Sequence, residues 1–400
     1  MALAPVYQFQ ELPEGLELVA PFGRFRVHSG IAVGRCCEVY EGEDCLQGEC
    51  VAVKVFRRHQ QYQGALQREL FFLKSLAATG APLVRHIGEL QWRGRDILVQ
   101  ELLGPTLRDV LLSYDHQPCS PWLVTTLTTH LLRGLQHLHD KGVVHGDLKP
   151  PNILWDADLA TFKLIDFGVS FTTSEELTHA VQSKGYQAPE CVVWSKAVAE
   201  DNLKSAEKPG TAADVWSAGC IVAECMINRQ LFPAGSQCED VPGDLHSAIT
   251  SVKTNFPPKY LEECYKFLLR CIQLCPEDRK GVRQLLEDPW LQRCPRPSFH
   301  DLLHLPTCVV RFMALTDPHP YPPLAYEMEN MVVSLCGRQG AVQGHHLEPS
   351  LGHLYVCFHS ARKAEAALDQ LSGENSSDAE SVSRRRSSYI KRAGRGVSCT

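Results

Sequence analysis

The sequence predicts an α+β protein with two lobes of different character and a smaller third unit. Strand-like segments separated by turns fill residues 22–103, whereas helical periodicity dominates residues 104–295. Beyond residue 295, prolines separate a segment in which strand and helix patterns alternate. The length of 400 residues agrees with this division, because roughly 150 residues is a common size for one domain.

The first lobe contains one helical stretch among its strands. Apolar residues recur every three or four positions between Gly64 and Ala77, at Leu66, Leu70, Leu73 and Leu76. Residues 1–21 are interpreted as an N-terminal extension that precedes the lobe. The pattern therefore predicts a small α+β lobe over residues 22–103.

The second lobe, residues 104–295, is predicted to be mostly helical. Its helical period is clearest over residues 123–138, 214–226 and 260–274, and strand patterns are scarce between them. The change of periodicity near residue 104 marks the boundary between the two lobes.

The third unit is predicted over residues 304–373, after a linker at 296–303. A strand-like run at 309–315, a helical stretch at 325–336, a strand at 354–358 and a helix at 361–371 follow one another. The order β-α-β-β-α fits a small ferredoxin-like module with its sheet on one side. Residues 374–400 contain seven serines and few large apolar groups, which predicts a disordered tail.

Composition narrows the class of protein. A net charge of −6 is too close to neutral for a protein that coats nucleic acid or anionic lipid along its whole length. The 17 cysteines form no C-x-x-C pair, which favours reduced thiols used as small hydrophobic side chains. No apolar run approaches the roughly 18 residues of a membrane span, and the N-terminus lacks the pattern of a secretory or mitochondrial signal.

The strongest chemical pattern lies between residues 145 and 190. It consists of HGDLKPPN at 145–152, DFG at 166–168 and APE at 188–190. In order and spacing these resemble the catalytic loop, the magnesium loop and the end of the activation segment of protein kinases. Upstream, VAVK at 51–54 resembles the strand that carries their phosphate-binding lysine.

The resemblance implies a role for each matching residue, with ATP and Mg²⁺ as cofactors. Lys54 is expected to bind the α- and β-phosphates and to be held by Glu69. Asp166 and Asn152 supply the hard oxygen ligands that Mg²⁺ prefers. The catalytic loop supplies the other two groups: Asp147 accepts the proton of the substrate hydroxyl, and Lys149, typical of serine/threonine kinases, stabilises the transferred phosphoryl group.

The nucleotide-covering loop departs from the family pattern G-x-G-x-x-G-x-V. Residues 32–39 keep only the middle glycine, Gly34, with Ala32 at the first glycine position and Val39 at the valine. Glycines there let backbone N–H groups approach phosphate, so the lost glycines predict weakened or reshaped ATP binding. Glu101 and Leu103 are expected at the adenine, in the hinge between the lobes.

Four further positions bear on regulation and structure. Gly146 replaces the arginine of the family motif H-R-D, which removes a guanidinium that would bind a phosphorylated activation loop, so we predict activity without such phosphorylation. Ser183 takes the place of the threonine that bonds the catalytic aspartate and lysine. Arg279 is expected to pair with Glu190. The polar Gln100 lies at the gatekeeper position before the hinge.

Within the kinases, the sequence is similar to the serine/threonine kinases that interact with stathmin and carry a U2AF-homology motif, an RRM-like module. The similarity runs from residue 22 to 373 and is carried by the segments 162–171, 185–190, 301–307 and 352–358. It implies a kinase of the nucleus and cytoplasm whose protein substrates are splicing factors and stathmin-like growth-control proteins. Gln187 stands where the family has an arginine that favours proline after the target serine, so proline direction stays open.

The RRM-like module lacks two features of its family. After Gly373 the sequence reads ENSS at 374–377 instead of the Arg-x-Phe loop that grips a tryptophan-containing peptide. Of the two surface aromatic residues that stack on RNA, Tyr355 is retained and His353 stands in the other place. Binding of RNA or of a tryptophan peptide is therefore disfavoured, and the simpler interpretation of Tyr355 is packing on the sheet.

Three functional hypotheses remain from the sequence. The first is an active kinase, favoured because every matched catalytic residue is present. The second is a pseudokinase scaffold, suggested by the altered glycine loop and Gly146. The third is an RNA or splicing-factor adaptor acting through residues 304–373. The basic stretch at 384–392 fits a nuclear import signal, a phosphorylation site at Ser387 or Ser388, or a solvated tail.

Overall fold

The structure is a computed structural model. It describes residues 12–34, 36–58, 60–77, 80–233, 241–251 and 256–296, and beyond these residues 305, 309–312, 322–337, 342–348, 353–361, 363–364 and 366–367. Across these ranges the helices are too short or too polar to span a membrane. The cysteines of the same ranges are free thiols. The tail at 374–400 and most of the linker at 296–303 lie outside the described residues.

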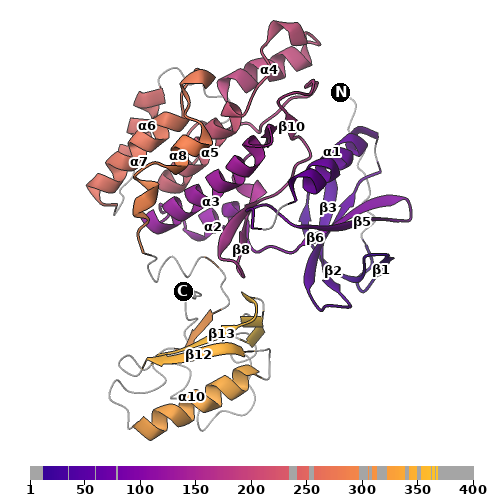
Figure 1. Ribbon diagram of the computed structural model, residues 1–400, viewed down its shortest axis with the longest axis vertical. Helices are drawn as coiled ribbons and strands as arrows, with labels where there is room; N and C mark the ends of the chain where they lie inside the picture. The colour runs from indigo at the N-terminus through magenta and orange to yellow at the C-terminus, as the bar shows by residue number, and fades with distance from the viewer. Residues whose placement is uncertain are drawn as a thin grey trace.

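The first lobe is an antiparallel sheet with one helix packed against it (Figure 1). The strand order is β1-β2-β3-β4-β6-β5. The elements are β1 (Glu17–Ala20), β2 (Gly23–Val33), β3 (Cys37–Asp44), β4 (Cys50–Phe56), α1 (Gln60–Leu76), β5 (His86–Trp92) and β6 (Arg95–Glu101).

Two boundaries of this lobe differ from the sequence prediction. The edge strand β1 lies inside the predicted extension 1–21 and pairs with β2, so the sheet begins before residue 22. Leu18 of β1 is buried in the core of the sheet, together with Leu12 before it. Helix α1 starts at Gln60, four residues before the predicted start at Gly64. The sequence pattern missed its first turn, because residues 60–63 lack the apolar repeat that marks the rest of the helix.

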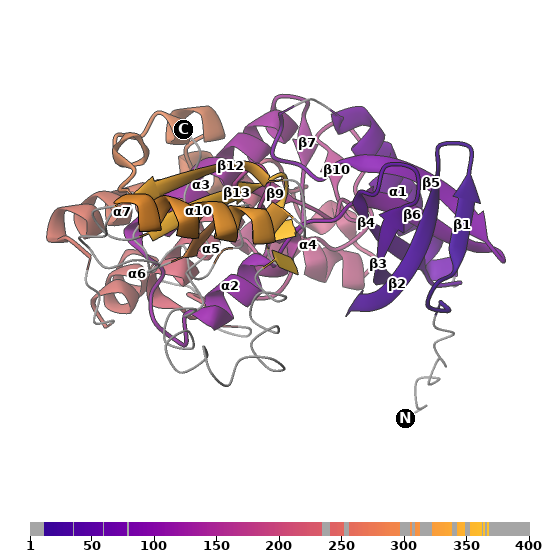
Figure 2. The ribbon, with the colours of Figure 1, turned by 90° about the horizontal axis from the view of Figure 1, so that it is seen from below.

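The second lobe is mostly helical, as predicted. Its helices are α2 (Leu107–Ser113), α3 (Pro121–His139), α4 (Pro189–Ala199), α5 (Ala212–Ile227), α6 (Val241–Thr250), α7 (Pro258–Cys271) and α8 (Val282–Leu286). Short strands β7 (Val143–Val144), β8 (Ile153–Asp156), β9 (Thr161–Leu164) and β10 (Phe171–Thr172) lie at the side that faces the first lobe (Figures 1 and 2). Single 3₁₀ turns complete the lobe, at η1 (Pro150–Asn152), η2 (Leu203–Ser205), η3 (Pro276–Asp278) and η4 (Leu291–Arg293).

Helices α3 and α5 form the centre of this lobe. Helix α3 begins at a Ser120 cap, whose side chain accepts a hydrogen bond from Leu123 N, and at Pro121, which suits the first helical turn. Helix α5 is buried along nearly its whole length, from Ala213 to Ile227. A helix that is apolar on every side belongs in a core, and the charged Asp214 inside it must therefore be satisfied by specific partners.

The third unit is a three-stranded antiparallel sheet with one long helix on one face (Figures 1 and 2). Its described elements are β11 (Val309–Phe312), α10 (Pro322–Gly337), β12 (Val342–Glu348) and β13 (His353–Phe358), with strand order β11-β13-β12. Leu354, Val356 and Phe358 of β13 are buried in one cluster with Val332 and Cys336 of α10.

The predicted order β-α-β-β-α includes a second strand in this unit to which no residues were assigned; the structure shows it as β12. The strand reads VQGHHLE, which has no clear apolar alternation, and its side chains are mostly exposed. Pairing with β13 determines it instead. A helical segment starts at Ala361, where the backbone N–H donates to Asp158 Oδ1 in the β8–β9 turn at 2.9 Å and links this unit to the second lobe.

Candidate active site

The predicted phosphate-binding lysine lies in a buried ion pair between sheet and helix. Strand β4 carries Lys54 and α1 carries Glu69, and Lys54 Nζ donates to both Glu69 carboxylate oxygens at 2.8 and 2.7 Å. Lys54 is 8% exposed and Glu69 is 1% exposed. Asp166 Oδ1 of the DFG motif lies 3.6 Å from the same ammonium, so residues from both lobes meet at this point.

The charges of Lys54 and Asp166 support one another, whereas burial raises the pKa of Glu69. Burial opposes the charge on Lys54, but the carboxylates of Glu69 and Asp166 outweigh it and raise the Lys54 pKa well above its ordinary value. In turn the ammonium of Lys54 lowers the pKa of Asp166. Lys54 and Asp166 are therefore both ionised at neutral pH. Removal of one member would leave an uncompensated buried charge, which typically costs about 3–5 kcal/mol.

The predicted catalytic residues form a second cluster around Asp147. Lys149 Nζ donates to Asp147 Oδ2 at 2.6 Å, and Ser183 Oγ donates to Asp147 Oδ1 at 2.7 Å. Lys149 Nζ also donates to Ser183 Oγ at 3.0 Å. The serine thus bonds both partners, in the position expected for the family threonine.

The loop that carries Asp147 is anchored to the core by Asp214 of α5, a residue with no exposed surface. Asp214 Oδ2 accepts the backbone N–H of His145 at 2.8 Å, and Oδ1 accepts that of Gly146 at 3.1 Å. The ring of His139 also contacts Oδ2, at 3.0 Å. These partners satisfy the charge that the apolar helix buries, and they fix the path of the catalytic loop.

The donor set near Asp166 fits a magnesium ion. Asn152 Nδ2 donates to the backbone carbonyl of Asp147 at 2.9 Å, which leaves Oδ1 of the amide as its ligand atom. Asp166 adopts a left-handed backbone with φ +66°, an uncommon conformation for a residue other than glycine. A carboxylate and an amide oxygen beside a phosphate-binding lysine are hard ligands of the kind that Mg²⁺ takes together with phosphate oxygens.

The predicted nucleotide loop is a tight hairpin between β2 and β3. Ala32 pairs with Val39, and Val39 pairs in turn with Lys54 of β4. At the turn, Gly34 N donates to the carbonyl of Cys37 at 2.8 Å, and a Cβ on Gly34 would lie 3.3 Å from that oxygen. Arg35 lies outside the described residues. Hydrogen bonding with Cys37, together with the charge of Lys54, lowers the pKa of Cys36 to about 7.

The hinge residues divide their roles between side chain and backbone. The carboxylate of Glu101 accepts Lys163 Nζ at 2.8 and 3.0 Å and Arg85 N at 2.8 Å, so the side chain is engaged within the protein. Any contact of Glu101 with adenine is therefore left to its backbone. Leu103 is half-buried against the core of the second lobe. Before them, Gln100 Nε2 is buried and has no hydrogen-bond partner among the described residues, which suits a site completed by a ligand.

Two structural pairs complete the site. Arg279 forms the expected bidentate ion pair with Glu190, at 2.6 and 2.8 Å, and its guanidinium is fully buried beside the ring of Trp216. Gln187 Nε2 donates to the carbonyl of Val181 at 3.0 Å and to Ser195 Oγ at 2.9 Å. The sequence did not predict the Lys163 contact with Glu101, because no local pattern joins residues 62 positions apart.

Comparison with known proteins agrees with this arrangement. The family model "Protein kinase domain" matches residues 25–291. The serine/threonine-protein kinase Kist of Homo sapiens is 30% identical over 290 residues, which cover 69% of this chain and 68% of that protein. The serine/threonine-protein kinase ppk5 of Schizosaccharomyces pombe is 30% identical over 223 residues, 54% of this chain and 25% of that protein.

A solved structure shows the same fold. The crystal structure of a kinase domain superposes with a TM-score of 0.57 and 21% sequence identity, and the match covers 70% of this chain and 98% of that one.

Proposed function

Since the chain belongs to the protein kinase family, as a serine/threonine kinase, we propose that it phosphorylates splicing and growth-control proteins with the machinery around Asp147 and Asp166. The observation that supports this most strongly is the complete set of contacts that joins Lys54, Glu69 and Asp166 and, beside them, Asp147, Lys149 and Ser183. A scaffold that only binds nucleotide has no need to keep both clusters.

In this proposal each residue acts by position and charge. Lys54, aimed by Glu69, binds the phosphates of ATP. Asp147 receives the proton of the substrate hydroxyl on the carboxylate that Lys149 orients through Oδ2 and Ser183 through Oδ1. Lys149 neutralises charge on the phosphoryl group as it moves. The family implies ATP and a divalent cation; Asp166 and Asn152 would hold the cation, which would neutralise phosphate charge.

The substrate class rests on the likeness to Kist and on the site itself. Lys149 beside Asp147 favours serine and threonine hydroxyls as acceptors. Splicing factors and stathmin-like proteins are proposed as substrates from the resemblance stated in the sequence analysis and from the match to that kinase over 69% of this chain. Gln187 fills the position of the family arginine and donates to three backbone or hydroxyl oxygens. Whether the kinase prefers proline after the target residue is therefore tested separately.

The third unit is proposed to be an RRM-like module. Its strand order β11-β13-β12, with α10 between the first two strands in sequence, supports this, since an RRM places its first and third strands side by side. The rings of His346 and His353 flank Tyr355 at 6.3 and 6.5 Å on the sheet face away from the buried cluster. Titration of the full chain with single-stranded RNA, followed by fluorescence, would detect stacking there. Tyr355→Ala is the matched variant. If the wild-type chain does not bind the RNA, an RNA-binding function of this unit is contradicted.

The catalytic proposal is tested by phosphoryl transfer from labelled Mg-ATP to a generic basic protein. We expect incorporation on serine and threonine with the wild type and none with Lys54→Met or Asp166→Asn. Lys74→Met is the control, because Lys74 lies on α1 but is exposed and pairs with Glu89 at the surface. Incorporation that survives both active-site substitutions would come from a contaminant and would overturn the proposal.

The proposal of nuclear and cytoplasmic location depends on the basic stretch at 384–392. Its test is microscopy of the tagged chain beside a variant in which Arg384, Arg385 and Arg386 are alanine. Loss of nuclear signal in the variant is expected, and an unchanged distribution would contradict an import signal. A peptide library with randomised flanks would then define the substrate preference and the consequence of Gln187.

A further inference from the structure

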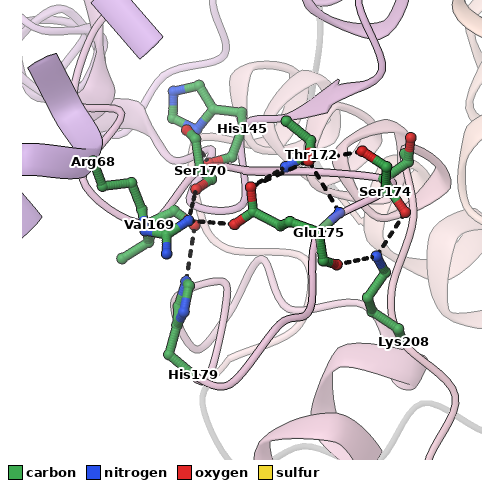
Figure 3. Close-up of polar contacts among 10 residues, drawn as sticks. Arg68, His145, Val169, Ser170, Thr172, Ser174, Glu175, His179 and Lys208 are labelled. Carbon is green, nitrogen blue, oxygen red and sulfur yellow. Dashed lines mark hydrogen bonds and ion pairs between the residues drawn. The ribbon is translucent and has the colours of Figure 1, made fainter. Parts of the chain in front are cut away.

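Helix α1 makes a second contact with the second lobe, next to the residue that holds Lys54. Arg68 precedes Glu69 and points out of the helix toward the segment after the DFG motif (Figure 3). Arg68 Nη1 donates to the carbonyl of Ser170 at 3.0 Å and to Glu175 Oε1 at 2.5 Å. The ion pair joins residues 107 positions apart, and its side chains are only 30% and 29% exposed.

Glu175 is held by several donors at once. Its second oxygen accepts the N–H of Thr172 at 3.1 Å and the hydroxyl of the same residue at 3.2 Å. Lys208 Nζ donates to the backbone carbonyls of Thr173 and Glu175, at 2.6 and 2.7 Å, and holds the same turn from the other side (Figure 3). Burial opposes the charge on Glu175, but Arg68 and the Thr172 donors outweigh it and lower the pKa of the carboxyl.

The turn held by Glu175 is also tied to the catalytic loop. Ser170 Oγ donates to the carbonyl of His145 at 2.8 Å, and the ring of His179 contacts the carbonyl of Val169 at 3.2 Å. Arg68 therefore connects α1, which carries Glu69, to the segment that carries Asp166 and, through Ser170, to the loop that carries Asp147. These are the three parts whose relative position determines the active site.

We propose that Glu175 acts as a built-in substitute for a phosphorylated residue and that its pair with Arg68 keeps the active site assembled without phosphorylation. A phosphoryl group on an activation segment orders it by creating charge-assisted bonds to arginine. Here a carboxylate already makes those bonds from within the segment. Arg68 and Glu175 are positioning residues, since they act through Glu69 and the catalytic loop. The inference rests on the proposed kinase function for its effect on activity but not for its structural part.

The kinetic test compares phosphatase-treated full-length chains. Glu175→Gln keeps the size of the side chain and removes its charge, and we expect kcat to fall at least about tenfold, because one partner of a charge-assisted network is lost. The KM for the protein substrate should change little, since neither residue belongs to the predicted substrate contacts. Glu176→Gln is the matched control: its side chain is exposed, and it neighbours Glu175 in sequence.

A second variant separates charge from folding. Glu175→Ser should lose activity like Glu175→Gln, and incorporation of phosphoserine at position 175 should restore it. The phosphate oxygens then lie the same number of bonds from the backbone as the glutamate oxygens and carry the charge that Arg68 binds. Failure of phosphoserine to restore any activity, in a chain with wild-type melting temperature, would overturn the proposal.

Hydrogen exchange gives a readout independent of catalysis. The amide of Thr172 and those of α1 should exchange faster in Glu175→Gln than in the wild type and should be unchanged in Glu176→Gln. Equal exchange in all three chains would contradict the proposed anchor. If the wild type transfers no phosphate at all, the proposed function fails, while the exchange result still decides the role of Glu175. Loss of wild-type activity on phosphatase treatment alone would also overturn the inference.

Discussion

Gly146 illustrates how one residue connects backbone geometry to the active site. Its φ is +77°, in the region that favours glycine, and its N–H is bonded to Asp214. A Cβ at this position would lie 3.1 Å from the carbonyl of Val169. The residue stands where the family has arginine. Glycine at this position therefore lacks the phosphate-binding guanidinium, and it also places no side chain on a backbone in the left-handed region. Sequence alone revealed the first consequence and not the second.

Substitution of Gly146 should therefore cost stability. Gly146→Ala is expected to lower the free energy of unfolding by about 1 kcal/mol, from the strained φ and the close carbonyl. Gly210→Ala is the control, because a Cβ there meets nothing within 4 Å and its φ is not in the left-handed region. Urea unfolding of both variants measures the difference. Equal urea midpoints for the wild type and Gly146→Ala would contradict the prediction, because they would show that the loop accepts a Cβ without loss of stability.

Among the elements, α5 has the largest effect on the site. It lies at the centre of the second lobe, and one of its two buried carboxylates, Asp214, holds the backbone of the catalytic loop. The helical period predicted α5 well, because apolar residues are frequent and helically spaced over residues 214–226. Strands β1 and β12 escaped prediction, since each depends on pairing with a neighbour rather than on its own residues.

Neutralising the anchor on α5 should loosen the catalytic loop. Asp214→Asn retains the shape but weakens bonds to His145, Gly146 and His139, and we expect a loss of about 2 kcal/mol in stability, as for hydrogen bonds to charged groups. The control Asp201→Asn changes an exposed residue whose φ of +50° asparagine also tolerates. Thermal unfolding and kcat are measured together. A stable variant with full kcat would refute the anchoring role.

At the scale of the whole molecule, the order of lobes and the motif residues were predictable from sequence. The kinase motifs consist of residues adjacent in sequence, so the sequence alone identifies them. The hydrophobic periodicity also changes where one lobe meets the next. Contacts that join distant segments were not predictable. Neither Lys163 with Glu101 nor Arg68 with Glu175 follows from any local pattern, because long-range pairing is determined by the packed fold.

Stability of the whole chain should fall in mild acid. Burial lowers the pKa of His130 on α3 from 6.5 to about 4, while its Nδ1 accepts the N–H of Phe162. Between these values the unfolded chain binds more protons than the folded one, so stability is full above pH 6.5 and is lost as the pH falls toward 4. At pH 5 the loss of unfolding free energy caused by this residue amounts to about 2 kcal/mol relative to neutral pH.

The acid effect is checked by urea unfolding at pH 7 and pH 5. His130→Asn keeps an acceptor for Phe162 N and cannot be protonated, so the stability difference between the two pH values should shrink by that amount. His116→Asn, at an exposed turn with φ +62°, should leave the difference as in the wild type. If His130→Asn showed the same pH dependence as the wild type, His130 would not be the cause of the loss of stability in acid.

The central claim is that the Asp147 cluster transfers phosphate and does not merely sit beside bound nucleotide. It is tested most directly by measuring Mg-ATP binding and transfer on the same preparations of wild type and Asp147→Asn. We predict that the variant binds Mg-ATP with a Kd close to that of the wild type, while its kcat falls at least about 100-fold, as expected for loss of a general base. A wild type that binds Mg-ATP without transferring phosphate, or an Asp147→Asn variant with undiminished kcat, would contradict the claim.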